Sequence, residues 1–148
     1  MLTCKQLETE PTLFKNLTGV GVGEFNQLLQ KLEPIWLQLN YQRLDYPNRQ
    51  RCIGGGPDFK LQLQDRCLMT LMLLHLQLNT ETLGYLFEVN KSTVSRNVRY
   101  ILPVLRKVKN GNLPRPPKRG TGKRIQQVLQ EYPNLLEISD VSELLLNS

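Results

Sequence analysis

Six polar and basic side chains lie close together between residues 91 and 99. They are Lys91, Ser92, Thr93, Ser95, Arg96 and Arg99. Four of them, at 92, 95, 96 and 99, recur three and four residues apart, which is the spacing of one face of an α-helix. Arg donates paired hydrogen bonds to guanine edges and to phosphates, and short hydroxyl side chains reach either target. This pattern indicates a helix that presents hydrogen-bond donors to the major groove of DNA. An ordinary solvated helix with two arginines is the alternative if the segment is considered alone.

The opposite face of the same segment is apolar. Val94, Val98, Ile101 and Leu105 recur at helical spacing, so that this face can pack against a core. Asn90 precedes the helix and is a favourable N-cap residue, because its side chain can accept a hydrogen bond from the first turn. We therefore expect a helix over 91–102, with Pro103 bending the chain after it.

Two preceding segments supply the elements that would position this helix. A short helix over 81–87 begins after Asn79 or Thr80, and its Leu83, Leu86 and Phe87 are spaced to pack inward. Gly84 would allow close approach of the next helix, and residues 88–90 form the turn, with Val89 filling the gap between the helices. The helix over 64–77 is apolar on nearly all sides and predicts a central, buried brace. The three segments predict a trihelical helix-turn-helix, and this context favours DNA binding over the solvated helix.

The remaining chain predicts a mainly α protein with a short C-terminal strand. Residues 10–18 favour an opening helix with Pro11 at its first position. Residues 24–41 favour a second helix, which Pro34 should kink or divide. Helical spacing returns over 123–132, and residues 134–140 favour a strand.

Basic residues accumulate along the chain. The net charge is +6 for the whole chain, with −1 over residues 1–48, +3 over 49–105 and +4 over 106–148. Between Arg106 and Arg124 there are eight basic and no acidic residues, interrupted by Pro and Gly. Such a segment is a linker by composition and a phosphate-contacting arm by charge. The candidate phosphate contacts are Arg106, Lys107, Lys109, Arg115, Lys118 and Arg119.

Composition argues against several other classes of protein. Three scattered cysteines and the lone His75 do not provide the four clustered ligands of a structural zinc site, and sparse cysteines suit a reducing compartment. No secretory signal or membrane span is visible, so we expect a cytoplasmic, nucleoid-associated protein. The triple glycine at 54–56 lacks the Lys-Ser or Lys-Thr of a phosphate-binding loop. It is either a flexible connector or a backbone contact to DNA.

Four stretches in order resemble the N-terminal region of bacterial insertion-sequence transposases of the DDE superfamily. They read FKNLTGVGVGEFNQLL, RCIGGGPDFKLQLQDRCLMTLMLL, LGYLFEVNKSTVSRNVRYILPVL and EYPNLLEISDVSE. The resemblance implies that residues 79–102 bind the terminal inverted repeats of a mobile element. It also implies that residues 134–140 are the first strand of an RNase-H-like domain. Asp140, in the sequence DVSE, then stands where the family has its first metal-binding carboxylate.

Three departures from the family pattern bear on activity. Glu88 occupies the turn where glycine is usual, which suggests an adjusted turn. Asn97 replaces an apolar residue in the recognition helix, which should weaken that edge of the core. After Glu143 the sequence LLLNS no longer follows the family pattern. A two-metal site needs several carboxylates to hold ions about 4 Å apart. We therefore expect no complete catalytic or metal site and no cofactor in this chain, with a divalent ion such as Mg²⁺ only in a complete transposase.

The sequence thus predicts a DNA-binding module without autonomous catalysis, either a first reading frame or a truncated remnant of a transposase. The expected regions are an N-terminal helical segment (1–43), a Gly-rich loop (44–62), the helix-turn-helix core (63–109), a basic linker (110–122) and the start of the RNase-H-like domain (123–148). Its expected partner is double-stranded DNA, with a homodimer or a separate catalytic domain as a further partner. A stand-alone helix-turn-helix transcriptional regulator is the alternative. A nuclease in which Asp140 acts with partners in trans is a third hypothesis.

Overall fold

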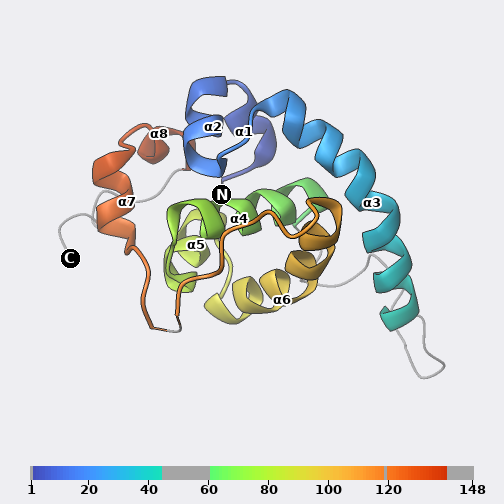
Figure 1. Ribbon diagram of the computed structural model, residues 1–148. Coiled ribbons are helices and arrows are strands. Elements are labelled where there is room, and N and C mark those ends of the chain that lie inside the picture. The colour runs from blue at the N-terminus through green and yellow to red at the C-terminus, as the bar shows by residue number, and fades with distance from the viewer. Residues whose placement is uncertain (1, 45–60, 119, 140–148) are drawn as a thin grey trace.

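The computed structural model describes residues 2–44, 61–118 and 120–139, and its regular secondary structure within these residues consists of α-helices (Figure 1). The helices are α1 (Cys4–Glu8), α2 (Pro11–Thr18), α3 (Val22–Leu44), α4 (Leu63–Leu76), α5 (Thr80–Phe87), α6 (Lys91–Val108), α7 (Ile125–Glu131) and α8 (Leu135–Ser139). The mainly α fold predicted from the sequence is confirmed.

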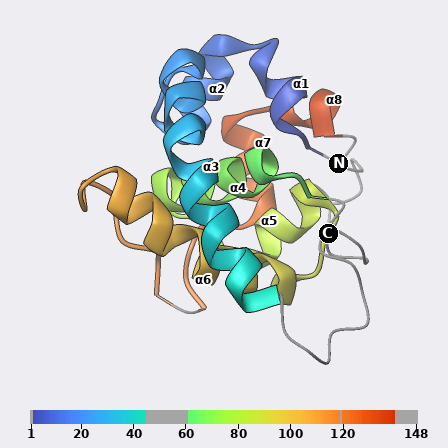
Figure 2. The same cartoon turned by 90° about the vertical axis from the view of Figure 1, so that its right-hand side faces the viewer.

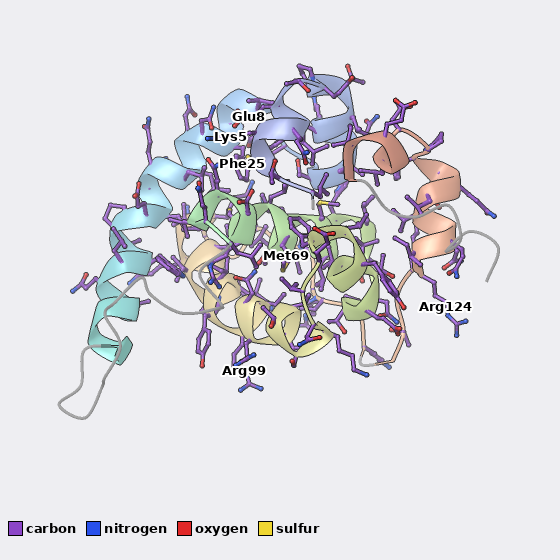
Figure 3. The ribbon with its side chains drawn as sticks, turned by 180° about the vertical axis from the view of Figure 1, so that it is seen from behind. Lys5, Glu8, Phe25, Met69, Arg99 and Arg124 are labelled. Carbon is purple, nitrogen blue, oxygen red and sulfur yellow. The ribbon has the colours of Figure 1, made fainter. Side chains whose placement is uncertain are left out.

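Helix α4 lies at the centre of the structure. Helices that precede it and helices that follow it in the sequence surround it: α1 and α2 lie on one side, and α5 and α6 lie on the other (Figure 1). Ten residues of α4 are buried, and Met69 lies in the middle of the molecule (Figure 3). A helix that is apolar on all sides must be covered on all sides. The prediction of a central brace is confirmed.

Local capping explains where the first helices begin and end. Thr3 and Gln6 form a capping box, in which each side chain accepts a hydrogen bond from the other's backbone N–H. This short helix was not predicted from the sequence. Helix α2 starts at Pro11 and ends at Gly19, whose φ of +82° is left-handed. A Cβ at Gly19 would lie 2.7 Å from His75 Nδ1, so glycine also permits α2 to end against α4.

Two helices continue through a proline. Pro34 does not divide α3, and α6 extends past Pro103 to Val108 (Figure 2). Both prolines are exposed. A proline on the solvent side leaves the carbonyl four residues earlier open to hydration, which lowers the penalty for the lost helical hydrogen bond. The expected end of the recognition helix at 102 is therefore corrected to 108.

Of the strand expected over 134–140, the structure describes residues 134–139, and these do not form a strand. Residues Leu135–Ser139 are helix α8, where Leu135 is buried and Ile138 packs against the same core. These two residues are three apart, which matches a helix and not the period of two in a strand. A strand also needs a neighbour to pair its backbone groups, whereas a helical turn satisfies them locally, as in the bond from Ile138 N–H to Asn134 O. Asp140 and Glu143 lie outside the described residues.

The N-terminal residues are anchored on the helix-turn-helix. Leu2 N–H donates to Leu86 O at 2.8 Å, at the end of α5. Cys4 N–H donates to the buried carboxylate of Asp65 in α4, also at 2.8 Å. Asp65, an acidic residue in the first turn of α4, thus also satisfies an N–H at the start of α1.

Candidate nucleic-acid interface

Helix α6 separates its side chains into a buried face and an exposed face. Val94, Asn97, Ile101 and Leu105 are buried against the core, and Val98 is half-buried. On the opposite face Lys91, Ser92, Ser95, Arg96 and Arg99 are exposed, and Thr93 is half-buried. The structure thus brings together on one surface the side chains that the sequence singled out.

The two arginines differ in their local contacts. Arg96 Nε donates to Ser92 O at 3.4 Å, which holds its chain along the helix. Arg99 points away from the body of the molecule (Figure 3). Both guanidinium groups are therefore on the surface, where a DNA strand can reach them.

The connection between α5 and α6 is a tight turn. Asn79 caps α5, since its Oδ1 accepts from Glu81 N–H at 2.6 Å. A Cβ at Gly84 would lie 2.7 Å from Val89 O, which confirms that glycine is needed for close approach. Glu88 adopts the left-handed conformation, φ 54° and ψ 48°, that glycine would adopt more easily. Glu88 therefore carries the conformational strain of this turn.

Asn90 stabilises the start of α6 through its backbone carbonyl. Its carbonyl accepts from Thr93 N–H at 2.9 Å and from Val94 N–H at 3.2 Å, but its side chain makes no capping hydrogen bond. The expected side-chain cap is therefore wrong, although the helix starts where predicted.

Asn97 does not weaken the core, contrary to expectation. It is 2% exposed, and its amide donates to Arg66 O at 3.0 Å and lies 3.4 Å from Thr70 Oγ1. Arg66 Nη1 donates back to Asn97 Oδ1 at 3.3 Å. A buried amide with all these partners avoids the desolvation penalty of an unpaired polar group. The amide links α6 to α4.

The basic segment after α6 is docked along the helix-turn-helix. It passes over α4 and returns to the beginning of α5 (Figure 1). Gln77 Nε2 donates to Arg115 O at 2.9 Å, and Lys123 forms an isolated parallel β-bridge with Leu78. Although it has a linker's composition, this segment packs against the folded core.

The basic side chains of this region have different surroundings. Arg106, Lys107, Arg115 and Lys118 are exposed. Lys109 is partly buried, with its Nζ 3.9 Å from a carboxylate oxygen of Glu24. Arg119 lies outside the described residues. The list of candidate contacts omitted two exposed residues: Tyr100, which is 40% exposed and four residues after Arg96, and Arg124, the last residue of the predicted basic segment, directly before α7. The spacing from Arg96 was a signal for Tyr100.

No group of three or more His, Cys, Asp or Glu side chains that could hold a metal occurs in residues 2–44, 61–118 and 120–139. Burial raises the pKa of the Cys4 thiol to about 12, with Glu8 adding to the rise, and burial also raises the pKa of Cys67. Both thiols are therefore protonated at neutral pH. Cys52, the glycines at 54–56 and Asp140 lie outside the described part. Within that part, no helix is long and apolar enough to cross a membrane.

Helices α4, α5 and α6, with a tight turn and an exposed polar face on the last helix, define a DNA-binding helix-turn-helix fold. Residues 59–108 match the family described as "Helix-turn-helix of DDE superfamily endonuclease", so this region is similar to the helix-turn-helix region of DDE-superfamily endonucleases. This confirms the resemblance seen in the sequence. The match covers the DNA-binding region and no catalytic domain. Comparison with curated proteins and with solved structures gave no match.

Proposed function

We propose that this chain binds double-stranded DNA sequence-specifically, at the terminal inverted repeats of its mobile element, with α6 in the major groove. The observation that carries the proposal is the segregation of α6, whose apolar residues are buried while five of its six candidate DNA contacts are exposed. The family match of residues 59–108 supports the same function.

The residues of the exposed face have distinct roles in this proposal. Ser92, Ser95 and Arg96 lie in the first turns of α6, where a recognition helix contacts base edges. Arg99 is one turn further along and binds a guanine or a phosphate. Lys91 and Thr93 bind phosphates at the start of the helix.

Basic side chains beyond the helix supply affinity that does not depend on sequence. Arg106, Lys107, Arg115, Lys118 and Arg119 contact phosphates in this proposal. Lys109 belongs to the same set, with a smaller contribution because part of its charge is balanced by Glu24.

We further propose that this chain recognises DNA without cutting it alone, and that a catalytic domain acts as its partner. A two-metal nuclease site needs several converging carboxylates, and Asp140 is the one candidate that the family resemblance assigns. Incubation of the purified chain with supercoiled plasmid and Mg²⁺ tests this directly. Metal-dependent nicking would overturn it and would support a nuclease assembled from several chains.

Gel-shift titration with the element's ends, and with scrambled duplexes of the same length, tests the DNA assignment. Arg96→Ala and Arg99→Ala should each weaken specific binding by about 1–3 kcal/mol. Lys15→Ala is the matched control, because Lys15 is exposed on α2, across the molecule from α6 (Figure 1). Equal affinity of the wild type and the double Arg variant would contradict the assignment. A stable dimer by light scattering, bound to a palindromic site away from the element's ends, would instead indicate a transcriptional regulator.

A further inference from the structure

Both ends of a short basic loop are hydrogen-bonded to Gln77. We call this loop, residues 115–118 and 120–123, the basic loop. At its start, Arg115 O accepts from Gln77 Nε2 at 2.9 Å. At its end, Lys123 N–H donates to Gln77 O at 2.9 Å. A surface loop whose two ends meet in this way is an Ω-loop, a type that often carries function.

The end of the basic loop makes the closest contacts with the helix-turn-helix. Lys123 O accepts from Asn79 N–H at 3.1 Å and from Thr82 Oγ1 at 2.8 Å. A Cβ at Gly122 would lie 2.7 Å from Asn79 N and 2.8 Å from Leu78 C. The loop backbone is therefore in direct contact with the connection between α4 and α5.

Within the loop, the chain has few conformations to lose on binding. Pro116 and Pro117 have fixed φ angles. Lys118 O accepts from Thr121 N–H at 2.9 Å and from Thr121 Oγ1 at 2.6 Å, which closes a turn. A segment ordered before it meets its ligand avoids part of the entropy loss of binding.

The attachment point places the basic loop beside a DNA strand. In helix-turn-helix complexes the first helix of the motif crosses the DNA backbone while the second lies in the major groove. The loop is joined to the residues that begin α5, the first helix of the motif. In both views the loop extends to the lower side of the molecule, where α6 also lies (Figures 1 and 2). Arg115 and Lys118 are exposed there, and residues 115–124 contain no acidic side chain.

We propose that the basic loop is a preorganised phosphate clamp, which holds the DNA backbone where α5 crosses it. The inference rests on the proposed DNA-binding function and adds to it: the positive charges act from a fixed position on the helix-turn-helix, not from a freely moving arm. The ligand is the phosphodiester backbone of duplex DNA, whatever its sequence.

Charge removal is the first arm of the test. The double variant Arg115→Gln with Lys118→Gln should lower the slope of log K against log salt concentration by about 1.8, because each neutralised phosphate contributes about 0.9 to that slope. The wild-type complex should show ethylation interference at phosphates beside the major-groove site, and this signal should disappear in the double variant. An unchanged slope with unchanged interference would overturn the clamp.

Loosening the loop without changing its charge is the second arm. Gln77 has a φ of +55°, so glycine suits this backbone position, and Gln77→Gly removes the side-chain bond to Arg115 O together with a local bond to Leu74 O within the end of α4. This variant should melt no lower than the wild type but bind DNA about five-fold more weakly, the effect of removing one hydrogen bond. A freely moving arm with the same charges predicts unchanged affinity, and that result would overturn the clamp.

A glycine pair provides a matched control that is independent of Gln77. Gly122→Val and Gly120→Val both place a branched residue at positive φ, but only Gly122 has neighbouring atoms within 4 Å. Gly122→Val should reduce DNA affinity more than Gly120→Val, with circular dichroism confirming that both remain helical. Equal affinities of these two variants would count against a docked loop.

Failure of the clamp and failure of the proposed function give different results. If the wild type does not bind duplex DNA, both the proposed DNA-binding function and the clamp are wrong. If the wild type binds and only the α6 variants lose sequence preference, while all loop variants match the wild type, recognition by α6 stands and the clamp alone is wrong.

Discussion

The side-chain amide of Asn97 in α6 donates to the backbone carbonyl of Arg66 in α4 at 3.0 Å, and the Arg66 guanidinium donates back to Asn97 Oδ1 at 3.3 Å. Apolar contacts alone would let the recognition helix rotate slightly about its axis, because they are not directional. Hydrogen bonds are directional. The pair therefore sets the rotation of α6, and with it the direction in which Ser92, Arg96 and Arg99 face.

Asn97→Ala should destabilise the protein by about 1–3 kcal/mol, because it removes buried hydrogen bonds and leaves a cavity. Urea denaturation followed by circular dichroism measures the change. Asn26→Ala is the control: Asn26 is exposed on α3, and the same substitution there should be neutral or slightly stabilising. Equal effects at the two positions would show that the Asn97 network contributes nothing to stability.

Gly84→Ala should destabilise the helix-turn-helix by about 1–3 kcal/mol, since the new methyl group would lie 2.7 Å from Val89 O and force the turn apart. Gly23→Ala is the matched change at another helical glycine, where no atom lies within 4 Å of the new methyl group. It should stabilise the protein by up to about 1 kcal/mol through helix propensity. Thermal melts of both variants check the pair, and a stabilised Gly84→Ala would contradict the close packing of the turn.

Local patterns in the sequence are sufficient to locate the central helices. The predicted bounds of α4, α5 and α6 agree with the structure within one residue at every end except the C-terminus of α6. Their signals are contained in a few consecutive residues: apolar spacing, Asn at the start of α5 and α6, and a long apolar run for the buried α4. The exposed face of α6 is predicted by the same spacing, because burying one side of a helix leaves the other side exposed.

Features that depend on distant partners could not be predicted in this way. Asn97 is satisfied by residues 27 to 31 positions away, and the basic loop is held by Gln77, 38 residues before Arg115. In the segment 134–139 the sequence offers two apolar pairs: Leu136 and Ile138 have the spacing of a strand, and Leu135 and Ile138 have the spacing of a helix. Packing of Leu135 and Ile138 against the core selects the helix. Local composition describes a segment's preference but not the surface that it meets in the fold.

Alkaline pH should destabilise the protein through its buried thiols. The Cys4 thiol donates to Glu8 Oε1 at 3.5 Å, and its pKa rises from the ordinary 9.0 to about 12. Because the folded-state pKa is above the unfolded one, the thiol's contribution to stability is complete below about pH 9 and is lost as pH rises toward 12. Melting temperatures at pH 8 and pH 11 should therefore differ more for the wild type than for the Cys4→Ala/Cys67→Ala variant. An equal pH response would assign the alkaline loss to other groups.

Glu88→Gly should stabilise the turn between α5 and α6. A non-glycine residue at the left-handed φ of 54° costs about 1–2 kcal/mol, and glycine's greater freedom in the unfolded chain offsets about 0.5–1 of that. The expected net gain is thus about 0.5–1 kcal/mol in the free energy of unfolding, measured in urea. Gln30→Gly, at an exposed right-handed position within α3, is the control and should lose about 1 kcal/mol. If both variants lost stability to the same extent, contacts of the Glu88 side chain would outweigh its backbone strain.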